Sequence, residues 1–171
     1  IGGLEKKNKI ITSEEKKVIA FHEAGHATTS WLLQYAHPLV KVTIVPRGNS
    51  LGAAWYLPEE RQITTKEQMY HEMIATLGGR AAEQVVFGQI STGALSDLEK
   101  VTKQAFAMVT YYGLDDEIGN ISYYDSTGQQ DYSFTKPYSE KTAETIDKEV
   151  SKLIEKAYQE AIAILTDHRD G

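Results

Sequence analysis

Residues 21–26 read FHEAGH, and the spacing of the two histidines indicates a metal-binding helix. On an α-helix, side chains four residues apart lie on the same face, so His22 and His26 can direct two imidazoles at one ion. Glu23 lies on the neighbouring part of the helix surface, where it reaches a water beside the ion rather than the ion itself. Zinc is the expected ion because it accepts three protein ligands and leaves a fourth position open for water. The motif therefore predicts a zinc site in which Glu23 is the general base of a metalloprotease.

The same letters would also fit a half-buried helix whose histidines bind nothing. Two neighbouring residues favour a metal site, because Ala24 and Gly25 are small and leave the helix surface open beside the histidines. A glycine in a helix interior costs about 1 kcal/mol relative to alanine. Close approach of another element to Gly25 would explain why this loss is tolerated.

Composition limits the possible partners and ligands. The chain has 171 residues, the size of one domain, with 18 Lys and Arg against 24 Asp and Glu and a net charge of −6. Such a chain presents no basic field for a phosphate backbone, so nucleic acid is not an expected partner. Cysteine is absent, so a transition metal must be held by His, Asp and Glu. No apolar run approaches the roughly 18 residues that a membrane span requires.

The third metal ligand cannot be chosen from spacing alone. The extended metzincin pattern would need Gly at Thr29 and His at Leu32, and neither is present. The other histidines are predicted to be surface or capping residues; they are His37, His71 and His168. A carboxylate on a downstream helix is the better candidate, and four are available: Glu72, Glu83, Asp97 and Glu99.

Hydrophobic periodicity and capping signals predict a mainly helical α+β fold with a small antiparallel sheet beside the metal helix. The expected helices cover residues 13–36, 64–87, 96–113 and 139–166, with capping boxes at Thr12/Glu15 and Thr64/Glu67, a start at Ser96 and a C-cap at Gly88. Residues 39–45 and 51–57 are the expected strands, and Val40, Val42 and Ile44 share one strand face. The glycine pair at 78–79 predicts close packing or a break, and residues 114–138 are expected to form a long surface loop.

Linked motifs along nearly the whole chain resemble the peptidase domain of the FtsH-type, membrane-anchored, ATP-dependent zinc metalloproteases. In order, they are GLEKKNKII, HEAGHA, VTIVPRGNSLG, GGRAAEQVVFG, STGALSDLEKVT, MVTYYGL and IDKEV. In that family the aspartate of the segment matched by STGALSDL is the carboxylate ligand, so the resemblance implies that Asp97 completes the zinc site. Glu83, inside GGRAAE, is the rival ligand. The PRG turn resembles the region beside the family's substrate cleft, or is a hairpin turn without a binding role.

The resemblance also implies features of a longer protein. Residues 1–11 would be a linker from a missing upstream AAA+ ATPase module that uses ATP and Mg²⁺, and residues 12–171 a zinc metallopeptidase domain truncated at its C-terminus. Missing transmembrane segments would attach it to the membrane, in a bacterium the cell inner membrane with the peptidase domain on the cytoplasmic side. The family works as hexameric homo-oligomer rings that degrade unfolded or extracted polypeptides. The P-loop pattern G-x-x-x-x-G-K-[ST] is absent from the 171 residues.

Two other readings remain at this point. One is an oligomerisation module, zinc-bound or metal-free, that has lost peptidase activity and organises a ring; the retained Glu23 argues against it, because a structural zinc site has no use for a neighbouring base. The other is a zinc hydrolase that acts on small amides, which the same residues allow chemically.

Overall fold

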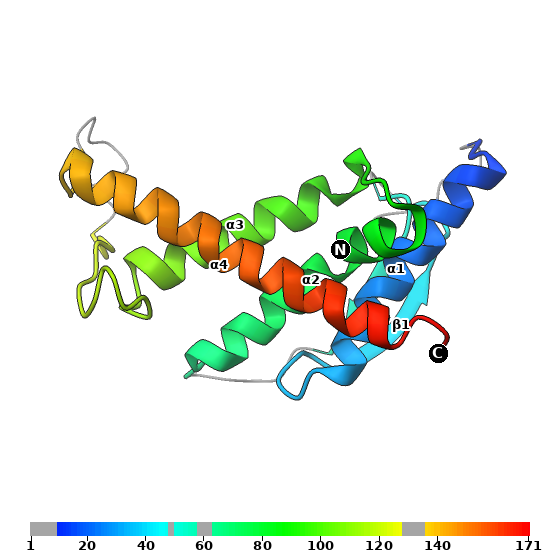
Figure 1. Cartoon of the computed structure of the whole chain (residues 1–171), viewed down its shortest axis with the longest axis horizontal. Helices are drawn as coiled ribbons and strands as arrows, with labels where there is room; N and C mark the ends of the chain where they lie inside the picture. Colours follow the sequence, from blue (N-terminus) through cyan, green and yellow to red (C-terminus); the bar gives the residue numbers. More distant parts are fainter. Residues whose placement is uncertain (1–9, 48–49, 58–62, 128–135) are drawn as a thin grey trace.

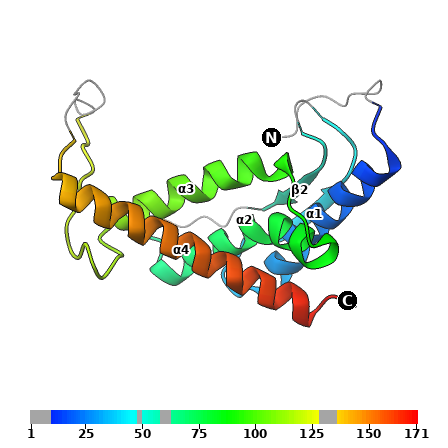
Figure 2. The ribbon, with the colours of Figure 1, turned by 45° about the horizontal axis from the view of Figure 1, so that its top comes forward.

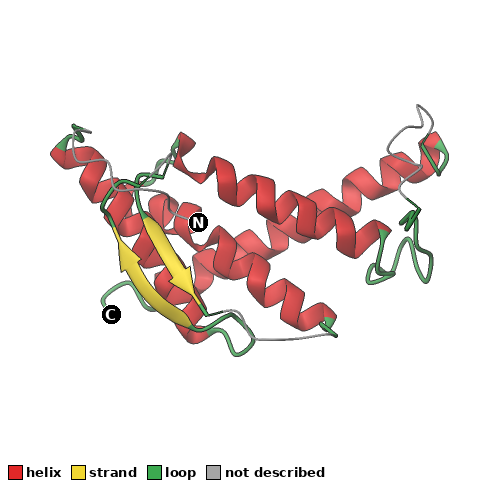
Figure 3. Cartoon of the chain, turned by 180° about the vertical axis from the view of Figure 1, so that it is seen from behind, coloured by secondary structure: helices red, strands yellow, loops and turns green. Residues whose placement is uncertain are grey.

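The computed structural model of the chain describes residues 10–47, 50–57, 63–127 and 136–171. Within these ranges it contains four α-helices and one two-stranded antiparallel sheet (Figures 1 and 3). Their order is α1 Ser13–Leu32, β1 Leu39–Thr43, β2 Ala53–Tyr56, α2 Lys66–Phe87, the short 3-10 helix η1 Thr92–Ala94, α3 Leu95–Thr110 and α4 Glu140–Asp167. The predicted α+β class, mainly helical with a small antiparallel sheet, is confirmed.

Three of the four helices begin at side-chain caps. The capping box of Thr12 and Glu15 at the start of α1 is confirmed. At α2 the box is formed by Thr65 and Gln68, one residue later than predicted. The adjacent threonines offer the same spacing, and glutamine serves as well as glutamate at the third position, so the sequence does not distinguish them. The predicted C-cap is confirmed, because Gly88 ends α2 in the left-handed conformation with φ 66°.

The predicted start of α3 and the predicted C-terminal end of α1 are wrong. Ser96 does not open α3, since η1 runs directly into the helix and Ala94 is the N-cap without a side-chain bond. Helix α1 ends at Leu32 rather than near residue 36. The chain leaves the helix there to pack on α2, where the Tyr35 backbone N–H donates to Nδ1 of His71 at 3.3 Å. Tertiary contact thus ends the helix before Pro38 does.

The two strands form one layer beside α1 (Figure 3). Strand β1 pairs with β2 in antiparallel register, with Leu39 opposite Tyr56 and Thr43 opposite Ala53. The predicted apolar face of β1 is the exposed one, because Val40 is 63% exposed. The sheet is covered on one face, where α1 packs against both strands, and its opposite face is exposed.

Helix α2 is the centre of the molecule (Figure 2). Residues 73–79 along it are all buried, which is the pattern of a helix covered on every side. It packs against α1 on one side and against α3 and α4 on the other. The main apolar cluster lies between α2, α3 and α4; its buried members are Met73, Ile74, Leu77, Ala81, Ala82, Val101, Ala105, Met108, Ala157, Ala161 and Leu165.

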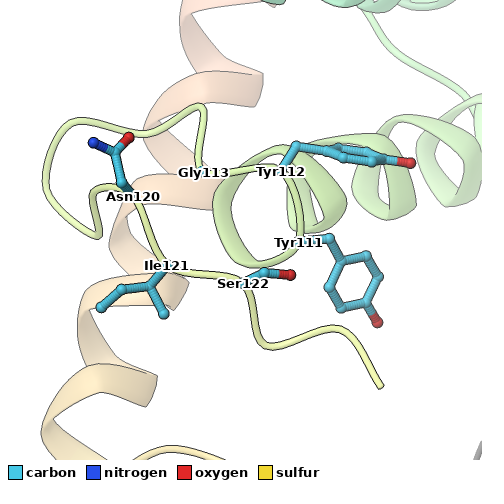
Figure 4. A pocket seen from close by; sticks show the side chains of 6 residues that line it. All are labelled: Tyr111, Tyr112, Gly113, Asn120, Ile121 and Ser122. Atoms are coloured by element: carbon cyan, nitrogen blue, oxygen red, sulfur yellow. The ribbon is translucent and has the colours of Figure 1, made fainter. Parts of the chain in front are cut away.

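The segment after α3 forms an open pocket that lies away from α1. Its lining residues are Tyr111, Tyr112, Gly113, Asn120, Ile121 and Ser122 (Figure 4). This pocket lies at the C-terminal end of α3, roughly 20 Å along the helix from its first turn. The predicted surface loop is irregular where it is described, and residues 128–135 of it lie outside the described residues. None of the described helices combines the length and apolar character that a membrane span requires.

Helices α1 and α2 cross at unusually short range, and glycines permit it. A Cβ at Gly25 would lie 2.6 Å from the Cβ of Ala82 and closer still to the Gly78 carbonyl oxygen. A Cβ at Gly78 would meet the Thr29 hydroxyl and the Gly25 carbonyl oxygen. The close packing predicted from the glycines is therefore confirmed, and α2 continues through residues 78–79 without a break.

Replacing Gly25 with alanine should destabilise the fold by about 1–3 kcal/mol, because overpacking outweighs the helix propensity gained. Urea unfolding of the full chain measures the change. Ala163, exposed on α4, is the matched control. There Ala163→Gly should cost about 1 kcal/mol, so that alanine is the better residue on the open helix and the worse one at the crossing. An increase in stability for Gly25→Ala would contradict the steric account.

Candidate metal centre

Helix α1 carries the three polar residues of the motif into the interior. His22, Glu23 and His26 are 8%, 8% and 6% exposed; the two histidines face α2, and Glu23 lies against the start of β2. Buried polar groups need partners, because each loses its hydrogen bonds to water.

Three ligand atoms converge at one point. Oδ2 of Asp97 lies 3.0 Å from Nε2 of His22 and 3.1 Å from Nε2 of His26, and the two Nε2 atoms are 3.2 Å apart. Asp97 comes from the first turn of α3, where the helix dipole favours a carboxylate. Among the described residues, the side chains of His22, His26 and Asp97 form a group whose ligand atoms lie close enough together to share one ion.

The outer ring nitrogens of both histidines are also bonded. Nδ1 of His22 lies 2.9 Å from Oε2 of Glu83, and Nδ1 of His26 lies 2.9 Å from the carbonyl oxygen of Ala75. Both partners are acceptors, so each Nδ1 carries the proton and donates. In the neutral rings that a metal ion requires, the lone pairs of both Nε2 atoms then face the shared point. Glu83, the rival ligand, is on the far side of the His22 ring from that point.

This donor set fits zinc. Two imidazole nitrogens and one carboxylate oxygen are ligands that zinc accepts in sites with an open position. A tetrahedral ion with bonds of about 2.0–2.1 Å separates its ligand atoms by about 3.3 Å, close to the three distances observed. A carboxylate on the outer nitrogen of a ligand histidine is also the usual outer partner in such sites.

The pKa values of His22 and Asp97 also show that the cluster favours a bound positive charge. Burial alone would lower the pKa of His22, but hydrogen bonds to Asp97 and Glu83 outweigh it and raise the pKa from 6.5 to about 9. Burial alone would raise the pKa of Asp97, but hydrogen bonds to His22 and His26 hold it well below its usual range. A proton therefore binds among these atoms readily, as a cation would.

Glu23 lies beside this cluster without joining it. Burial raises the pKa of Glu23, and the two histidines act in the opposite direction. Strand β2 approaches it closely, since a Cβ at Gly52 would lie 3.0 Å from Cγ of Glu23. Tyr56, at the other end of β2, also has its pKa raised, first by burial and further by the charges of Glu23 and Asp97.

The remaining histidines and carboxylates named from the sequence lie elsewhere. Nε2 of His37 pairs with Oε1 of Glu72 at 3.1 Å, and Nδ1 of His168 donates to the Ile164 carbonyl oxygen at the end of α4. Glu99 pairs with Lys103 on the exposed side of α3. His71 accepts from the Tyr35 backbone, as described above.

Sequence reasoning missed two contributors to the cluster. Gly79 packs under the His22 ring, where a Cβ would lie 2.6 Å from Cδ2 and closer to Nε2. The other is the Ala75 carbonyl, because backbone groups leave no signal in a motif. The two adjacent glycines of GGRAAE were the sequence signal for the Gly79 contact. Gly78 allows the close approach of α1, and Gly79 leaves room for the His22 imidazole.

The fold and this cluster define the class of protein, a metallopeptidase domain with an H-E-x-x-H helix. The sequence matches Peptidase family M41 over residues 9–171. An ATP-dependent zinc metalloprotease FtsH from Parabacteroides distasonis is 67% identical over 171 residues, which are 100% of this chain and 25% of that protein. The mitochondrial inner membrane m-AAA protease component AFG3L2 of Mus musculus is 50% identical over 169 residues, 99% of this chain and 21% of that protein. The chain belongs to peptidase family M41, and the predicted FtsH-type resemblance is confirmed.

The chain spans about a quarter of the length of the curated relatives it matches. An FtsH protein from Karelsulcia muelleri, 58% identical over 170 residues, is likewise covered over only 27% of its length. The predicted boundaries, a linker at 1–11 and a peptidase domain at 12–171, stay predictions.

The raised pKa of His22 makes the stability of the metal-free chain depend on pH. Protonation of His22 stabilises the fold fully below about pH 6.5, and this contribution is lost as the pH rises through about 9. The free energy of unfolding in EDTA should therefore fall across that window. With zinc the trend should reverse, because the ion displaces the proton. Urea unfolding at a series of pH values measures both trends.

The control for this pH series is His22→Gln, which removes the titrating ring. In the variant the free energy of unfolding should change less with pH, both in EDTA and with zinc. The same pH dependence in the variant and the parent chain would show that another group is responsible.

Proposed function

We propose that this chain is the zinc endopeptidase domain of an ATP-driven, membrane-anchored protease, with zinc held by His22, His26 and Asp97. The observation that carries the proposal is the convergence of two Nε2 atoms and one carboxylate oxygen within 3.2 Å of one another. The lone pairs face inward because Glu83 and Ala75 hold the outer nitrogens.

Glu23 has the position and the environment of a general base. When bound, zinc would polarise the scissile carbonyl and acidify the attacking water. Glu23 takes the proton of that water as it attacks and later passes it to the leaving amine. Its raised pKa suits the first step, because a more basic carboxylate accepts the proton more readily.

Strand β2 is the proposed binding surface for substrate backbone. Gly52 brings the start of this strand against Glu23, and the sheet pairs β2 with β1 on one side only among the described residues. An extended polypeptide added at its open edge would be held by main-chain hydrogen bonds, which give affinity with little sequence preference. Unfolded or extracted polypeptides are therefore the proposed substrates.

The longer protein would supply the rest of the activity. We propose an upstream AAA+ module that uses ATP and Mg²⁺, transmembrane segments, and a hexameric ring of identical chains, in a bacterium at the inner membrane with this domain on the cytoplasmic side. These proposals rest on the relatives, whose names include ATP-dependent proteases and an inner-membrane protease component. The alternative, an inactive zinc-binding oligomerisation module, leaves the buried Glu23 without a role.

Glu23→Gln in the full-length protein separates chemistry from structure. The change is nearly isosteric and removes the base, so proteolysis of an unfolded substrate such as casein should fall by orders of magnitude while zinc content is kept. Metal analysis and a casein assay on the same preparation measure the two outcomes. Proteolysis at the parental rate would refute the general-base role, and an inactive parental protein with bound zinc would favour the oligomerisation module.

Asp97→Asn tests the third ligand against a neighbour on the same helix. The amide is a weak neutral ligand, so zinc affinity should fall sharply and proteolysis should end. Glu99→Gln is the matched control, because Glu99 lies two residues further on and pairs with Lys103 at the surface. Zinc titration against a chelator should separate the two variants. Equal zinc affinity in both would refute the assignment of Asp97.

A further inference from the structure

Glu83 is a fully buried carboxylate, so both of its oxygens need hydrogen-bond donors. Oε2 receives Nδ1–H of His22 at 2.9 Å. Oε1 receives the hydroxyl of Ser91 in a short hydrogen bond. The carboxylate is therefore clamped between one proposed zinc ligand and a serine outside the helices.

Ser91 is also tied to the turn that leads to the third proposed ligand. It is the N-cap of η1, where its hydroxyl oxygen accepts the backbone N–H of Gly93 at 3.1 Å. Helix η1 runs directly into α3, and Asp97 lies in the first turn of that helix. A single hydroxyl thus donates towards the His22 side of the cluster and accepts from the segment that carries Asp97.

We infer that Ser91 is a positioning residue for the metal centre, which links the orientation of His22 through Glu83 to the placement of Asp97. The inference rests on the proposed zinc site and assigns Ser91 no contact with the ion. Because the two connections share one oxygen, loss of the hydroxyl loosens both sides of the site together. The geometry assigns this task to Ser91 rather than to Ser96, which lies inside α3.

The physical effect of removing the hydroxyl follows from burial. Ser91→Ala leaves Oε1 of Glu83 without its donor in the interior, so the carboxylate moves towards water or another donor. The His22 ring then loses a fixed partner for Nδ1. Changes to such outer partners typically cost 10–100-fold in metal affinity.

The test is the rate of zinc release from the full-length protein to an excess of a coloured chelator. We expect Ser91→Ala to release zinc about 10–100-fold faster than the parental protein. Ser91→Thr keeps the hydroxyl, and residue 91 is exposed, so this variant should restore slow release. Release at the parental rate from Ser91→Ala would overturn the inference.

Ser139→Ala is the matched control for lost helix capping. Ser139 caps α4 by accepting the Thr142 N–H, and it lies outside the metal cluster. This variant should unfold at a lower urea concentration than the parental protein, without faster zinc release. Equally fast release from Ser139→Ala would show that general destabilisation, not the link to Glu83, explains the effect.

A double-mutant cycle with Glu83→Gln tests whether Ser91 acts through Glu83. If it does, the effects of the two changes on zinc release should be strongly non-additive. Additive effects would overturn the proposed path. A parental protein that binds no zinc would refute the proposed function itself, whereas slow release from all variants would refute only the role of Ser91.

Discussion

The close crossing of α1 and α2 at Gly25 and Gly78 is the constraint on which the site depends. Only hydrogen atoms fit where a Cβ of either residue would meet the opposite backbone. At this separation the Ala75 carbonyl reaches Nδ1 of His26, and Glu83 reaches Nδ1 of His22, both at 2.9 Å. N–H···O hydrogen bonds normally span about 2.7–3.2 Å, so a small increase in the distance between the helices would weaken both bonds. The close packing of α1 against α2 therefore also fixes the orientation of both imidazole rings.

The charges around this crossing explain why the buried cluster calls for a cation. Glu23, Glu83 and Asp97 bring three carboxylates to the two imidazoles at this crossing. Burying like charges together is unfavourable unless positive charge compensates them. In the metal-free chain the compensation comes from a proton, and the raised pKa of His22 is its signature. A divalent ion would compensate the same excess of negative charge more fully, at the point where the lone pairs of the ligands meet.

The parts of the structure that local rules control were predictable from sequence. The spacing of His22 and His26 gave a shared face, and the unfavourable Gly25 indicated a close neighbour, which proved to be Gly78. Partners brought together by tertiary packing were not predictable by the same means. Spacing could not choose between Glu83 and Asp97, since each lies far along the chain from α1, and a family resemblance was needed. Serine is a common N-cap residue, but the 3-10 helix η1 runs directly into α3, so Ser96 lies inside the helix instead of capping it.

The environment of Glu23 separates a hydrolytic site from a structural one. Buried carboxylates are normally held by hydrogen bonds, as Glu83 is by His22 and Ser91. Glu23 is 8% exposed, yet within the part of the chain that the structure describes no donor is bonded to its carboxylate. Glu23 is not among the residues whose buried side-chain polar atoms lack a partner in the described part of the chain, so its oxygens keep access to solvent. A base that must accept a proton from water and return it needs such access, whereas a structural zinc site has no use for a neighbouring carboxylate, so the environment of Glu23 supports the hydrolytic reading.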